Sequence, residues 1–428
     1  MYGVALKQIR KENWKSTKVR IMKKIAFVFA GQGSQYVGMC RDLYQDERIV
    51  KELFDEASRI LGFSLSDTCF YDKNNELNTT YMSQLSIFVS SVAQAKCFLQ
   101  KNNIAPDYVA GNSVGEYAAL VIAGVMSFED ALKLLNLRAR YMNDSAEEKQ
   151  GSMYAVRHYP MYKVQSLVDE YSKQGVITIS NINGKDNYVI SGETKLAEET
   201  VNSIDDENAV ITRLNVKSGF HSMLMESAYL KLTEYIKNFD FSEPRCTVLS
   251  NVTGKPYKNA EEIRNTLAKQ IVSTVRWYDM IRWMEKDGCT DAIEFGPMFI
   301  MRNLILGNSN IKALSYDKPD DLKIIMNDLS FRRMMLYAIG AFMSKATAAK
   351  NNNHDEKGYV SEVVQPYREI EKLYDEVKNT EFIDIDSNHA EMCKRNLDRI
   401  LRFKNDSAID NNTEEIYSNM LNLLIHKY

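Results

Sequence analysis

The feature of this sequence that most favours chemistry is a serine that lies between two glycines. The segment Gly111-Asn-Ser-Val-Gly115 matches the G-x-S-x-G pattern of a nucleophile elbow, a tight turn that presents a serine hydroxyl at the start of a helix. Bulkier neighbours would clash in so strained a turn. An apolar strand pattern precedes it at residues 108–111, and an apolar helical pattern follows at residues 118–124. This context favours Ser113 as a nucleophile; the alternative is a purely structural turn.

A serine nucleophile needs a base, and histidine is the commonest one. The chain has five histidines. His354, His389 and His426 lie in a C-terminal region that we expect to be an extension, and His158 lies in a predicted inserted unit. His221 lies where the chain leaves that unit and returns to the main domain. Elimination therefore favours His221 as the base, although a lone histidine is more often structural than catalytic.

A glycine-rich loop, Ala30-Gly-Gln-Gly-Ser-Gln35, follows the first apolar strand pattern. Such a loop can cradle a phosphate, but this one has no G-x-G-x-x-G pattern, no P-loop lysine and no spaced acidic residue. The alternative use is an exposed backbone N–H at Gln32 that points into an oxyanion hole.

The elements around these residues alternate between strand and helix patterns. Short buried strands are expected at residues 25–30, 108–111 and 292–295, and helices at residues 39–61, 83–99 and 277–286. Strand, turn and helix in this order predict an α/β fold with a parallel sheet, here an α/β-hydrolase-like large subdomain. Residues 152–217 instead show a βαββαβ pattern, which predicts an inserted ferredoxin-like small subdomain.

The region after Tyr316 shows only helical periodicity, at residues 331–350, 359–378, 388–403 and 414–425. We therefore expect a helical C-terminal extension. The predicted organisation has five segments: a disordered leader (1–21), the large subdomain in two parts (22–151 and 218–327), the small subdomain (152–217) and the extension (328–428).

The leader is basic but is followed by no apolar run of the secretory type, so it is read as a disordered segment or as the product of a start codon upstream of Met22. A basic arm that contacts a membrane surface is the alternative.

The composition of the whole chain limits the functions and locations that it could have. The formal net charge of −3 gives no reason to expect nucleic acid as a partner. The six cysteines have no metal-ligand spacing, which favours reduced thiols in a cytoplasmic protein, and no apolar run is long enough for a membrane span.

Five segments in a fixed order carry a family resemblance: Gly31-Gln-Gly-Ser-Gln35, Gly111-Asn-Ser-Val-Gly-Glu-Tyr117, Arg138, Phe220-His-Ser222 and Glu294-Phe-Gly-Pro297. Together they resemble malonyl-CoA:acyl carrier protein transacylases and the acyltransferase domains of polyketide synthases. The resemblance is collinear from about residue 24 to residue 317, and it covers neither the leader nor the extension.

The resemblance implies a role for each matching residue. Ser113 would take the acyl group, and His221 would be the base, oriented by the backbone carbonyl of Gln270. The N–H groups of Gln32 and Val114 would form the oxyanion hole. The implied reaction transfers a malonyl group from malonyl-CoA to the phosphopantetheine thiol of an acyl carrier protein, with malonyl-CoA as a substrate and no cofactor.

Four further residues would shape the acyl pocket. Arg138, twenty-five residues after the serine, would hold the malonyl carboxylate in a bidentate pair; taken alone, it would be read as a surface helix charge. Phe220 would leave little room for an α-methyl branch. Gln84 would line the pocket, although Leu85 follows it where the family usually has proline. Asn112 stands where the family usually has histidine, and asparagine carries no proton at neutral pH.

The expected function is that of a stand-alone, trans-acting enzyme of polyketide or fatty-acid biosynthesis. The departures at Asn112 and at Met298, in place of the usual glycine, together with the extension, favour a polyketide or hybrid pathway over the housekeeping fatty-acid enzyme. One alternative is an acyl hydrolase that clears stalled acyl groups from carrier proteins. Another is a non-catalytic protein that docks carrier proteins. An unrelated esterase would be expected to show an acidic residue as the third member of its triad.

Overall fold

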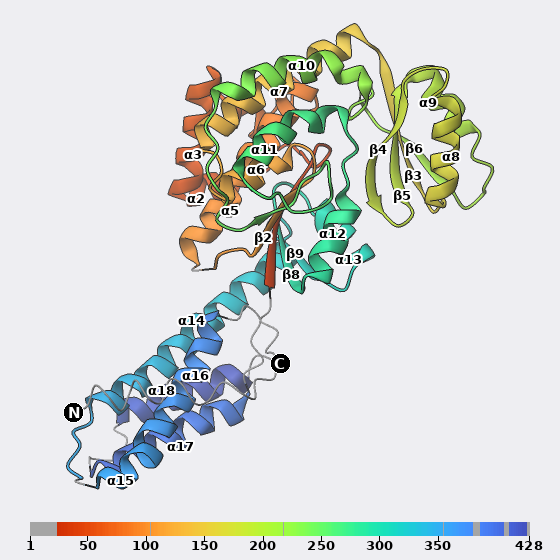
Figure 1. The fold of residues 1–428 in the computed structure, drawn as a ribbon. Helices are drawn as coiled ribbons and strands as arrows, with labels where there is room; N and C mark the ends of the chain where they lie inside the picture. Colours follow the sequence, from red (N-terminus) through yellow and green to blue (C-terminus); the bar gives the residue numbers. More distant parts are fainter. Residues whose placement is uncertain are drawn as a thin grey trace.

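The computed structural model describes residues 24–102, 104–216, 218–353, 355–379, 386–405 and 411–425. The predicted leader lies outside these residues. Figure 1 shows a large α/β unit, a smaller sheet with two helices beside it, and a bundle of helices that projects from the large unit.

The large unit is built on a parallel sheet of five strands in the order β7-β2-β1-β8-β9. The strands are β1 (Lys24–Phe29), β2 (Tyr108–Gly111), β7 (Thr247–Val248), β8 (Cys289–Phe295) and β9 (Lys312–Ser315). Successive residues of β1 face opposite sides: Phe27 packs in the larger core and Val28 in the core beneath the other face. Both faces are therefore covered, as expected for a parallel sheet.

Helices cover the two faces of this sheet. The helices of the large unit are α2 (Arg41–Asp46), α3 (Arg48–Leu61), α4 (Leu65–Phe70), α5 (Thr80–Lys101), α6 (Gly115–Ile122), α7 (Phe128–Glu148), α10 (Glu226–Tyr235), α11 (Ala260–Leu267), α12 (Trp277–Lys286) and α13 (Ile300–Asn308). The short 3₁₀ turns are η1 (Met223–Met225), η2 (Ile236–Asn238) and η3 (Ala268–Val272). The single helix predicted over residues 39–61 is wrong, because the backbone is extended at Glu47 and divides it into α2 and α3.

The smaller unit has the predicted βαββαβ order. Its elements are β3 (Gly151–Arg157), α8 (Met161–Tyr171), β4 (Ile177–Gly184), β5 (Asn187–Glu193), α9 (Thr194–Asn202) and β6 (Val210–Arg213). The four strands form an antiparallel sheet in the order β4-β5-β3-β6, which is the ferredoxin-like arrangement. Tyr154 and Val156 of β3 pack with the side chains of α8 and α9, so the intervening residues point to the opposite face.

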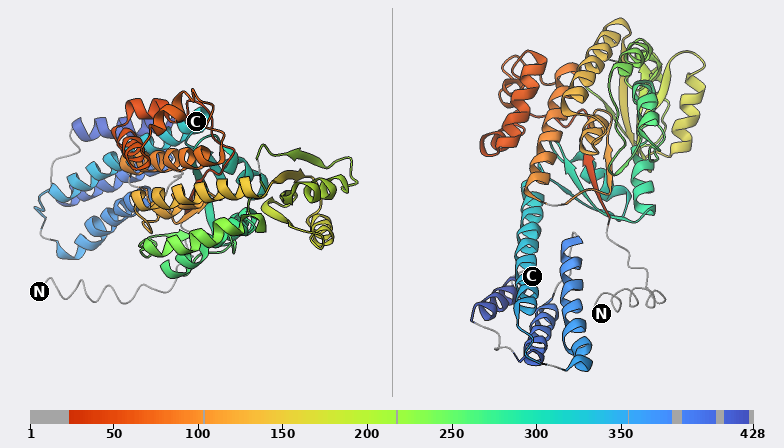
Figure 2. Two further views of the ribbon diagram at one scale, coloured as in Figure 1. Left: turned by 90° about the horizontal axis from the view of Figure 1, so that it is seen from above. Right: turned by 60° about the vertical axis from the view of Figure 1, so that its left-hand side comes forward.

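The C-terminal bundle has its own hydrophobic core. Its elements are α14 (Pro319–Ala348), α15 (Glu356–Tyr359), a π-helical turn η4 (Val360–Val364), α16 (Gln365–Asn379), α17 (Ser387–Phe403) and α18 (Asn411–Ile425). Phe342, Leu373 and Leu397 are among the buried side chains that join these helices. Figure 2 shows that α14 is the helix that leads from the large unit into the bundle.

The predicted start of the first helix of the extension, at residue 331, is wrong. The helix begins at Pro319, with proline in the first turn and Asp320 and Asp321 beside it, and it continues through the predicted boundary at 327. Among the described residues, no helix is both long enough and apolar enough to span a membrane.

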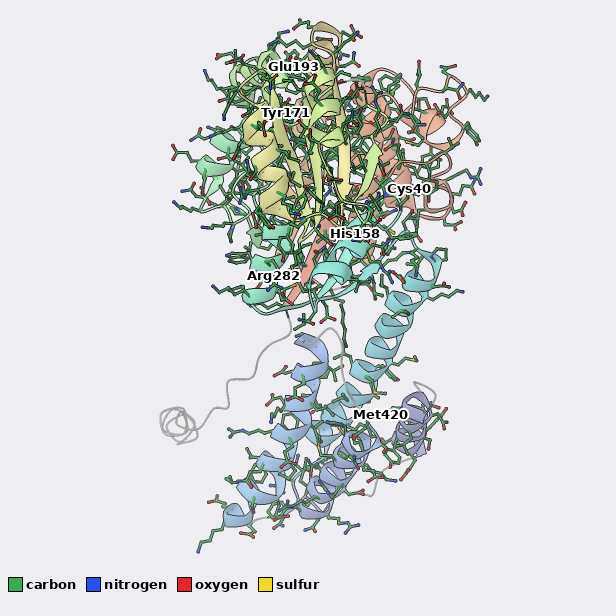
Figure 3. All side chains as sticks on the ribbon, turned by 90° about the vertical axis from the view of Figure 1, so that its right-hand side faces the viewer. Cys40, His158, Tyr171, Glu193, Arg282 and Met420 are labelled. Atoms are coloured by element: carbon green, nitrogen blue, oxygen red, sulfur yellow. The ribbon has the colours of Figure 1, made fainter. Side chains whose placement is uncertain are left out.

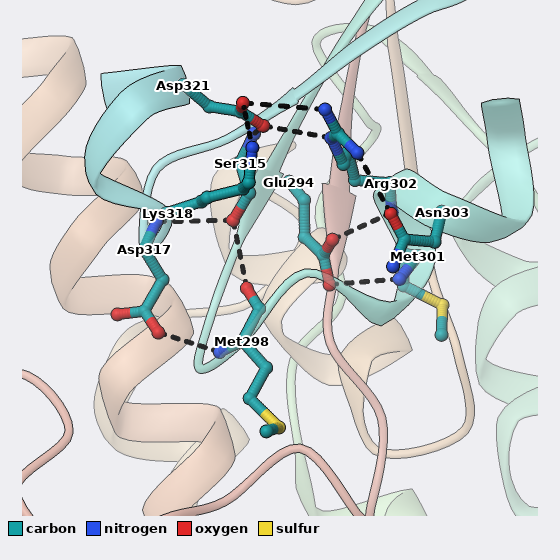
Figure 4. A network of polar contacts seen from close by, with 9 residues as sticks. All are labelled: Glu294, Met298, Met301, Arg302, Asn303, Ser315, Asp317, Lys318 and Asp321. Atoms are coloured by element: carbon teal, nitrogen blue, oxygen red, sulfur yellow. Dashed lines mark hydrogen bonds and ion pairs between the residues drawn. The ribbon is translucent and has the colours of Figure 1, made fainter. Parts of the chain in front are cut away.

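Figure 4 shows how the start of α14 is attached to the large unit. The buried carboxylate of Asp321 accepts hydrogen bonds from Arg302 Nε at 2.9 Å, Lys318 Nζ at 2.9 Å and the Ser315 N–H at 3.1 Å. Arg302 belongs to α13 and Ser315 to β9. The first turn of α14 is therefore bonded to two elements of the large unit.

Glu294, at the end of β8, fixes α13 in turn (Figure 4). Its fully buried carboxylate accepts from the N–H of Met301 at 3.1 Å and of Arg302 at 2.7 Å, in the first turn of that helix. Burial raises the pKa of Glu294 to about 8. The Glu294-Phe-Gly-Pro motif thus positions α13, which forms one wall of the cleft described below.

Candidate active site

Ser113 lies at a strained turn between β2 and α6. Its φ of 52° is in the left-handed region, which non-glycine residues seldom adopt. No residue larger than glycine fits at either flanking position. A Cβ at Gly111 would lie 1.9 Å from the carbonyl carbon of Gly115, and a Cβ at Gly115 would lie 2.5 Å from the backbone oxygen of Phe29. The elbow predicted from the sequence is present, and it presents Ser113 at the N-terminus of α6.

The side chain of Asn251 holds this turn from another part of the chain. Its Oδ1 accepts from the Ser113 N–H at 2.8 Å, and its Nδ2 donates to the carbonyl of Gly111 at 2.7 Å. The Asn251 amide therefore connects the serine to the strand that precedes it. Asn251 could not be predicted as a site residue, because nothing near it in sequence marks it.

Ser113 and His221 are in direct contact. Ser113 Oγ lies 2.8 Å from His221 Nε2, and His221 Nδ1 lies 2.8 Å from the backbone carbonyl of Gln270. A carbonyl can only accept, so Nδ1 carries the proton and Nε2 presents its lone pair to the serine. Burial, followed by the nearby charge of Arg138, lowers the pKa of His221 to about 4. The imidazole is therefore neutral at pH 7, the form that a base requires.

Arg138 reaches the same point from α7. It is 1% exposed, and its Nη2 donates to Ser113 Oγ at 3.0 Å and to Gln270 Oε1 at 2.9 Å, while Nη1 donates to Gln84 Oε1. No carboxylate of the described residues forms an ion pair with it, and its Nε has no hydrogen-bond partner there. A surface helix charge, the alternative reading for Arg138, is ruled out by this burial.

Glu116 and Gln270 form a buried polar layer behind the serine. Gln270 Nε2 donates to the Ser113 carbonyl at 2.9 Å and also to Glu116. Glu116 accepts further bonds from Tyr257 Oη at 2.8 Å and from the Asn251 N–H at 3.2 Å. Burial raises the pKa of Glu116 to about 7. Glu116 belongs to the motif that carries the family resemblance, but no role was predicted for it; its place directly after a nucleophile elbow was the available signal.

The two predicted oxyanion donors have N–H groups without an acceptor. Neither the Gln32 N–H nor the Val114 N–H donates to any group in the described part of the chain. Val114 directly follows the serine and lies at the N-terminal cap of α6. The N–H group of the residue after the serine is one of the donors that the oxyanion hole of a nucleophile elbow uses.

A cleft of about 600 Å³ opens from the serine between the large and small units. Ser113, His221, Gln32, Asn112 and Phe220 all line it. The ring of Phe220 is packed, because the residue is 4% exposed, and its backbone carbonyl accepts from Ser191 Oγ at 2.7 Å, which fixes the backbone just before the histidine. The side chain of Asn112 makes no hydrogen bond within the described residues and packs against Gly31, where a Cβ would lie 2.8 Å from its Oδ1.

The structure thus brings one group of the predicted site residues into a single hydrogen-bond network: Ser113, His221, Gln270, Arg138 and Gln84. The others lie at the cleft or beside the serine. A serine with a buried neutral histidine, at the elbow of a parallel α/β sheet, defines the class of serine-dependent acyl-transferring and acyl-hydrolysing enzymes.

Comparison with known proteins narrows this class. Residues 26–297 match the acyl transferase domain family. The malonyl CoA-acyl carrier protein transacylase of Bacillus subtilis strain 168 is 33% identical over 72% of this chain and 98% of its own length. Among solved structures, FabD from Acinetobacter baumannii has a TM-score of 0.68 and 32% identity over 72% of this chain and 98% of that chain. The chain therefore belongs to the malonyl CoA-acyl carrier protein transacylase family.

Two further comparisons extend this result. A malonyl-transacylase in complex with its type II PKS acyl-carrier protein has a TM-score of 0.66 and 30% identity over 70% of this chain and 98% of that chain. A second Bacillus subtilis transacylase is 31% identical over 84% of this chain and 92% of its own length. Because 84% of 428 residues is about 360, that similarity includes part of the C-terminal extension beyond residue 327.

Proposed function

We propose that this enzyme transfers a malonyl group from malonyl-CoA to the phosphopantetheine thiol of an acyl carrier protein through an ester on Ser113. The observation that carries the choice of acyl group is Arg138. A buried guanidinium is costly unless it is paired; the buried Glu116 attracts Arg138 only through space, and no carboxylate of the described residues bonds to it directly. The free carboxylate of a malonyl group bound next to Ser113 would supply the missing partner in a bidentate pair.

The first half-reaction forms the ester. Ser113 Oγ attacks the thioester carbonyl of malonyl-CoA while His221 Nε2 takes the hydroxyl proton. The N–H groups of Gln32 and Val114 donate to the oxyanion that forms. The carbon–sulfur bond then breaks, and the thiol of CoA leaves with the proton from His221.

The second half-reaction repeats these steps with the carrier protein. The phosphopantetheine thiol enters the cleft, gives its proton to His221 and attacks the ester carbonyl. The tetrahedral intermediate collapses, the proton passes from His221 to Ser113 Oγ, and malonyl leaves on the carrier protein. The carbonyl of Gln270 keeps the imidazole in the required tautomer throughout, because it accepts from Nδ1–H.

Arg138 also weighs against the competing functions. A hydrolase of simple acyl chains would leave the buried guanidinium beside an apolar group, which is unfavourable. A protein that only docks carrier proteins would have no need for a neutral His221 in contact with Ser113. An unrelated esterase would use an acidic third residue, whereas here the partner of His221 is the carbonyl of Gln270.

The domain organisation and the cellular setting are part of the proposal. We propose that the predicted segments 22–151 and 218–327 form the acyltransferase subdomain and residues 152–217 the inserted subdomain of a stand-alone, trans-acting enzyme of polyketide or fatty-acid biosynthesis. The extension predicted at residues 328–428 begins earlier, with α14 at Pro319. The six cysteines are all free thiols, which supports a reducing, cytoplasmic location. No cofactor is needed for either half-reaction, since both proceed by nucleophilic attack and proton transfer.

Intact-mass spectrometry tests the proposed function directly. Mixing the protein with malonyl-CoA should add one malonyl mass, and adding a holo acyl carrier protein should move that mass to the carrier. The Ser113→Ala variant should take up no malonyl group. Addition that persists in this variant would refute the seryl ester, and loss of the ester to water rather than to the carrier would favour the hydrolase.

A further inference from the structure

One charged residue of the cleft has no part in the reaction described above. Arg157, at the end of β3, is the only lysine, arginine, aspartate or glutamate among the described residues that line the cleft. Its side chain is exposed, and it forms no hydrogen bond or ion pair with any residue that the structure describes. The guanidinium is therefore not engaged in holding the fold together.

Strand β3 leads from the catalytic pair to Arg157. At its start, a Cβ on Gly151 would lie 2.5 Å from the N of Gly219, two residues before His221. Met153, Ala155 and Arg157 alternate along the strand and all line the cleft. At a rise of about 3.3 Å per residue, Arg157 lies about 13 Å further along the cleft wall than Met153.

The outer end of the cleft is built by three elements that meet near Arg157. Arg157 pairs with Asn187 of β5, which also lines the cleft. The β4–β5 turn is bonded to α13, because the Lys185 N–H donates to Asn308 Oδ1 at 3.2 Å. Figure 3 labels His158, the next residue along the chain, near the junction between the small sheet and the large unit.

The two substrates of the proposed function share one feature at this distance from the thioester. Malonyl-CoA brings the acyl group on the thiol of a pantetheine arm, the carrier protein accepts it on the thiol of the same kind of arm, and in both the far end of the arm is a phosphate ester. About 13 bonds separate the sulfur from the phosphorus, which gives an extended reach of about 15 Å by the geometry of an extended chain. This length is comparable to the roughly 13 Å of cleft wall between Met153 and Arg157. A guanidinium is a strong ligand for phosphate.

We infer that Arg157 binds the phosphate at the end of the pantetheine arm, both in malonyl-CoA and in the carrier protein. The inference rests on the proposed function, and it adds a binding residue for the part of the substrate that does not react. Because Arg157 touches neither the acyl group nor Ser113, its loss should raise KM and leave kcat nearly unchanged.

A series of substrates that differ in the phosphate tests this role. Malonyl-pantetheine has no phosphate, malonyl-4′-phosphopantetheine has one, and malonyl-CoA has the same phosphate in a longer chain. For Arg157→Gln, kcat/KM for ester formation should fall about tenfold with the two phosphate-bearing donors and should not change with malonyl-pantetheine. The loss should shrink at high salt, because the site is exposed. Transfer from the preformed ester to holo carrier protein should show a similar loss.

Arg213 provides a matched control in the same sheet. It lies on β6, next to β3, but its guanidinium is over the ring of Tyr154, on the face opposite the cleft. Arg213→Gln should leave all three donors unaffected. Arg157→Lys, which keeps the charge, should recover part of the loss.

Two results would overturn the inference. An equal loss with malonyl-pantetheine would show that Arg157 acts on the shape of the cleft and not on the phosphate. Unchanged kinetics with all three donors would show that it does not bind substrate. In both cases the wild type would still form the ester, whereas failure of the proposed function would leave the wild type without any malonyl adduct.

Discussion

Replacing Arg138 with alanine is the most direct test of why this site would prefer a malonyl group. The wild-type guanidinium donates to Ser113 Oγ, Gln270 and Gln84 from a position that is 1% exposed. Removing one half of a buried, hydrogen-bonded charge pair typically costs about 2–5 kcal/mol. At 1.36 kcal/mol for each factor of ten, kcat/KM for malonyl-CoA should fall by about 30- to 5,000-fold.

The kcat/KM for acetyl-CoA should fall much less, because the acetyl group has no carboxylate that pairs with Arg138. The malonyl-to-acetyl ratio of kcat/KM should therefore fall in Arg138→Ala by most of that factor. A competition assay measures the ratio in one tube: both thioesters are mixed with the protein, the reaction is quenched early, and intact-mass spectrometry counts the two adducts. An unchanged ratio would refute the role of Arg138 as the carboxylate partner.

Two further variants separate binding from folding. Arg138→Ala leaves Gln84 and Gln270 without a donor, so its melting temperature must be measured beside its activity. Arg138→Lys keeps a charge but loses the planar, bidentate geometry, and its ratio should lie between those of the wild type and the alanine variant. Arg140→Ala removes an exposed arginine from the same helix and should leave the ratio unchanged.

Three other substitutions and a pH profile address the neighbours of Ser113. His221→Ala should slow ester formation by about 10²–10⁴, the usual contribution of a positioned base. Since burial lowers the pKa of His221 to about 4, wild-type kcat/KM should stay level from pH 8 to about pH 5 and fall only near pH 4; an acid limb at the ordinary histidine value would contradict this. We expect the wild type to prefer malonyl-CoA over methylmalonyl-CoA by about 10–200-fold, and Phe220→Ser should reduce this preference. A wild type that uses both donors equally, or that does not use methylmalonyl-CoA at all, would contradict the role of the packed ring. Asn112→His should change the rate of ester formation by less than the loss of Ser113 or His221; a fast variant made from an inert wild type would show that this chain is not an active transferase.

Much of the fold could be predicted because its signals are local. The apolar run of β1 predicts a strand that is buried on both faces, and Gly111 and Gly115 mark a turn that leaves no room for a Cβ. The residues at which helices begin were harder to predict. α5 begins at Thr80 and not at residue 83, because Thr79 caps it by accepting from the Met82 N–H. The start of α14 was also marked, by Pro319 followed by two acidic residues, but the hydrophobic periodicity becomes clear only later.

The polar layer behind the serine could not be predicted from local patterns. Asn251 bonds to Ser113 across 138 residues, and the Gln270 side chain bonds to the Ser113 carbonyl across 157 residues. A single asparagine or glutamine in a loop carries no periodicity that would show its partner. The family resemblance supplied the carbonyl of Gln270, but not the three further hydrogen bonds of its side chain.

Arg138 and His221 are coupled in a way that only the geometry reveals. The charge of Arg138 helps to lower the pKa of His221. If a malonyl carboxylate binds Arg138, it offsets that charge, so the pKa of His221 should rise and the histidine should become a stronger base in the bound complex. An acetyl group cannot do this. The acid limb of kcat, which reports the bound complex, should therefore lie at higher pH for malonyl-CoA than for acetyl-CoA, while the acid limb of kcat/KM, which reports the free enzyme, should be the same for both. If the acid limb of kcat lies at the same pH for malonyl-CoA and acetyl-CoA, the carboxylate does not offset the charge of Arg138.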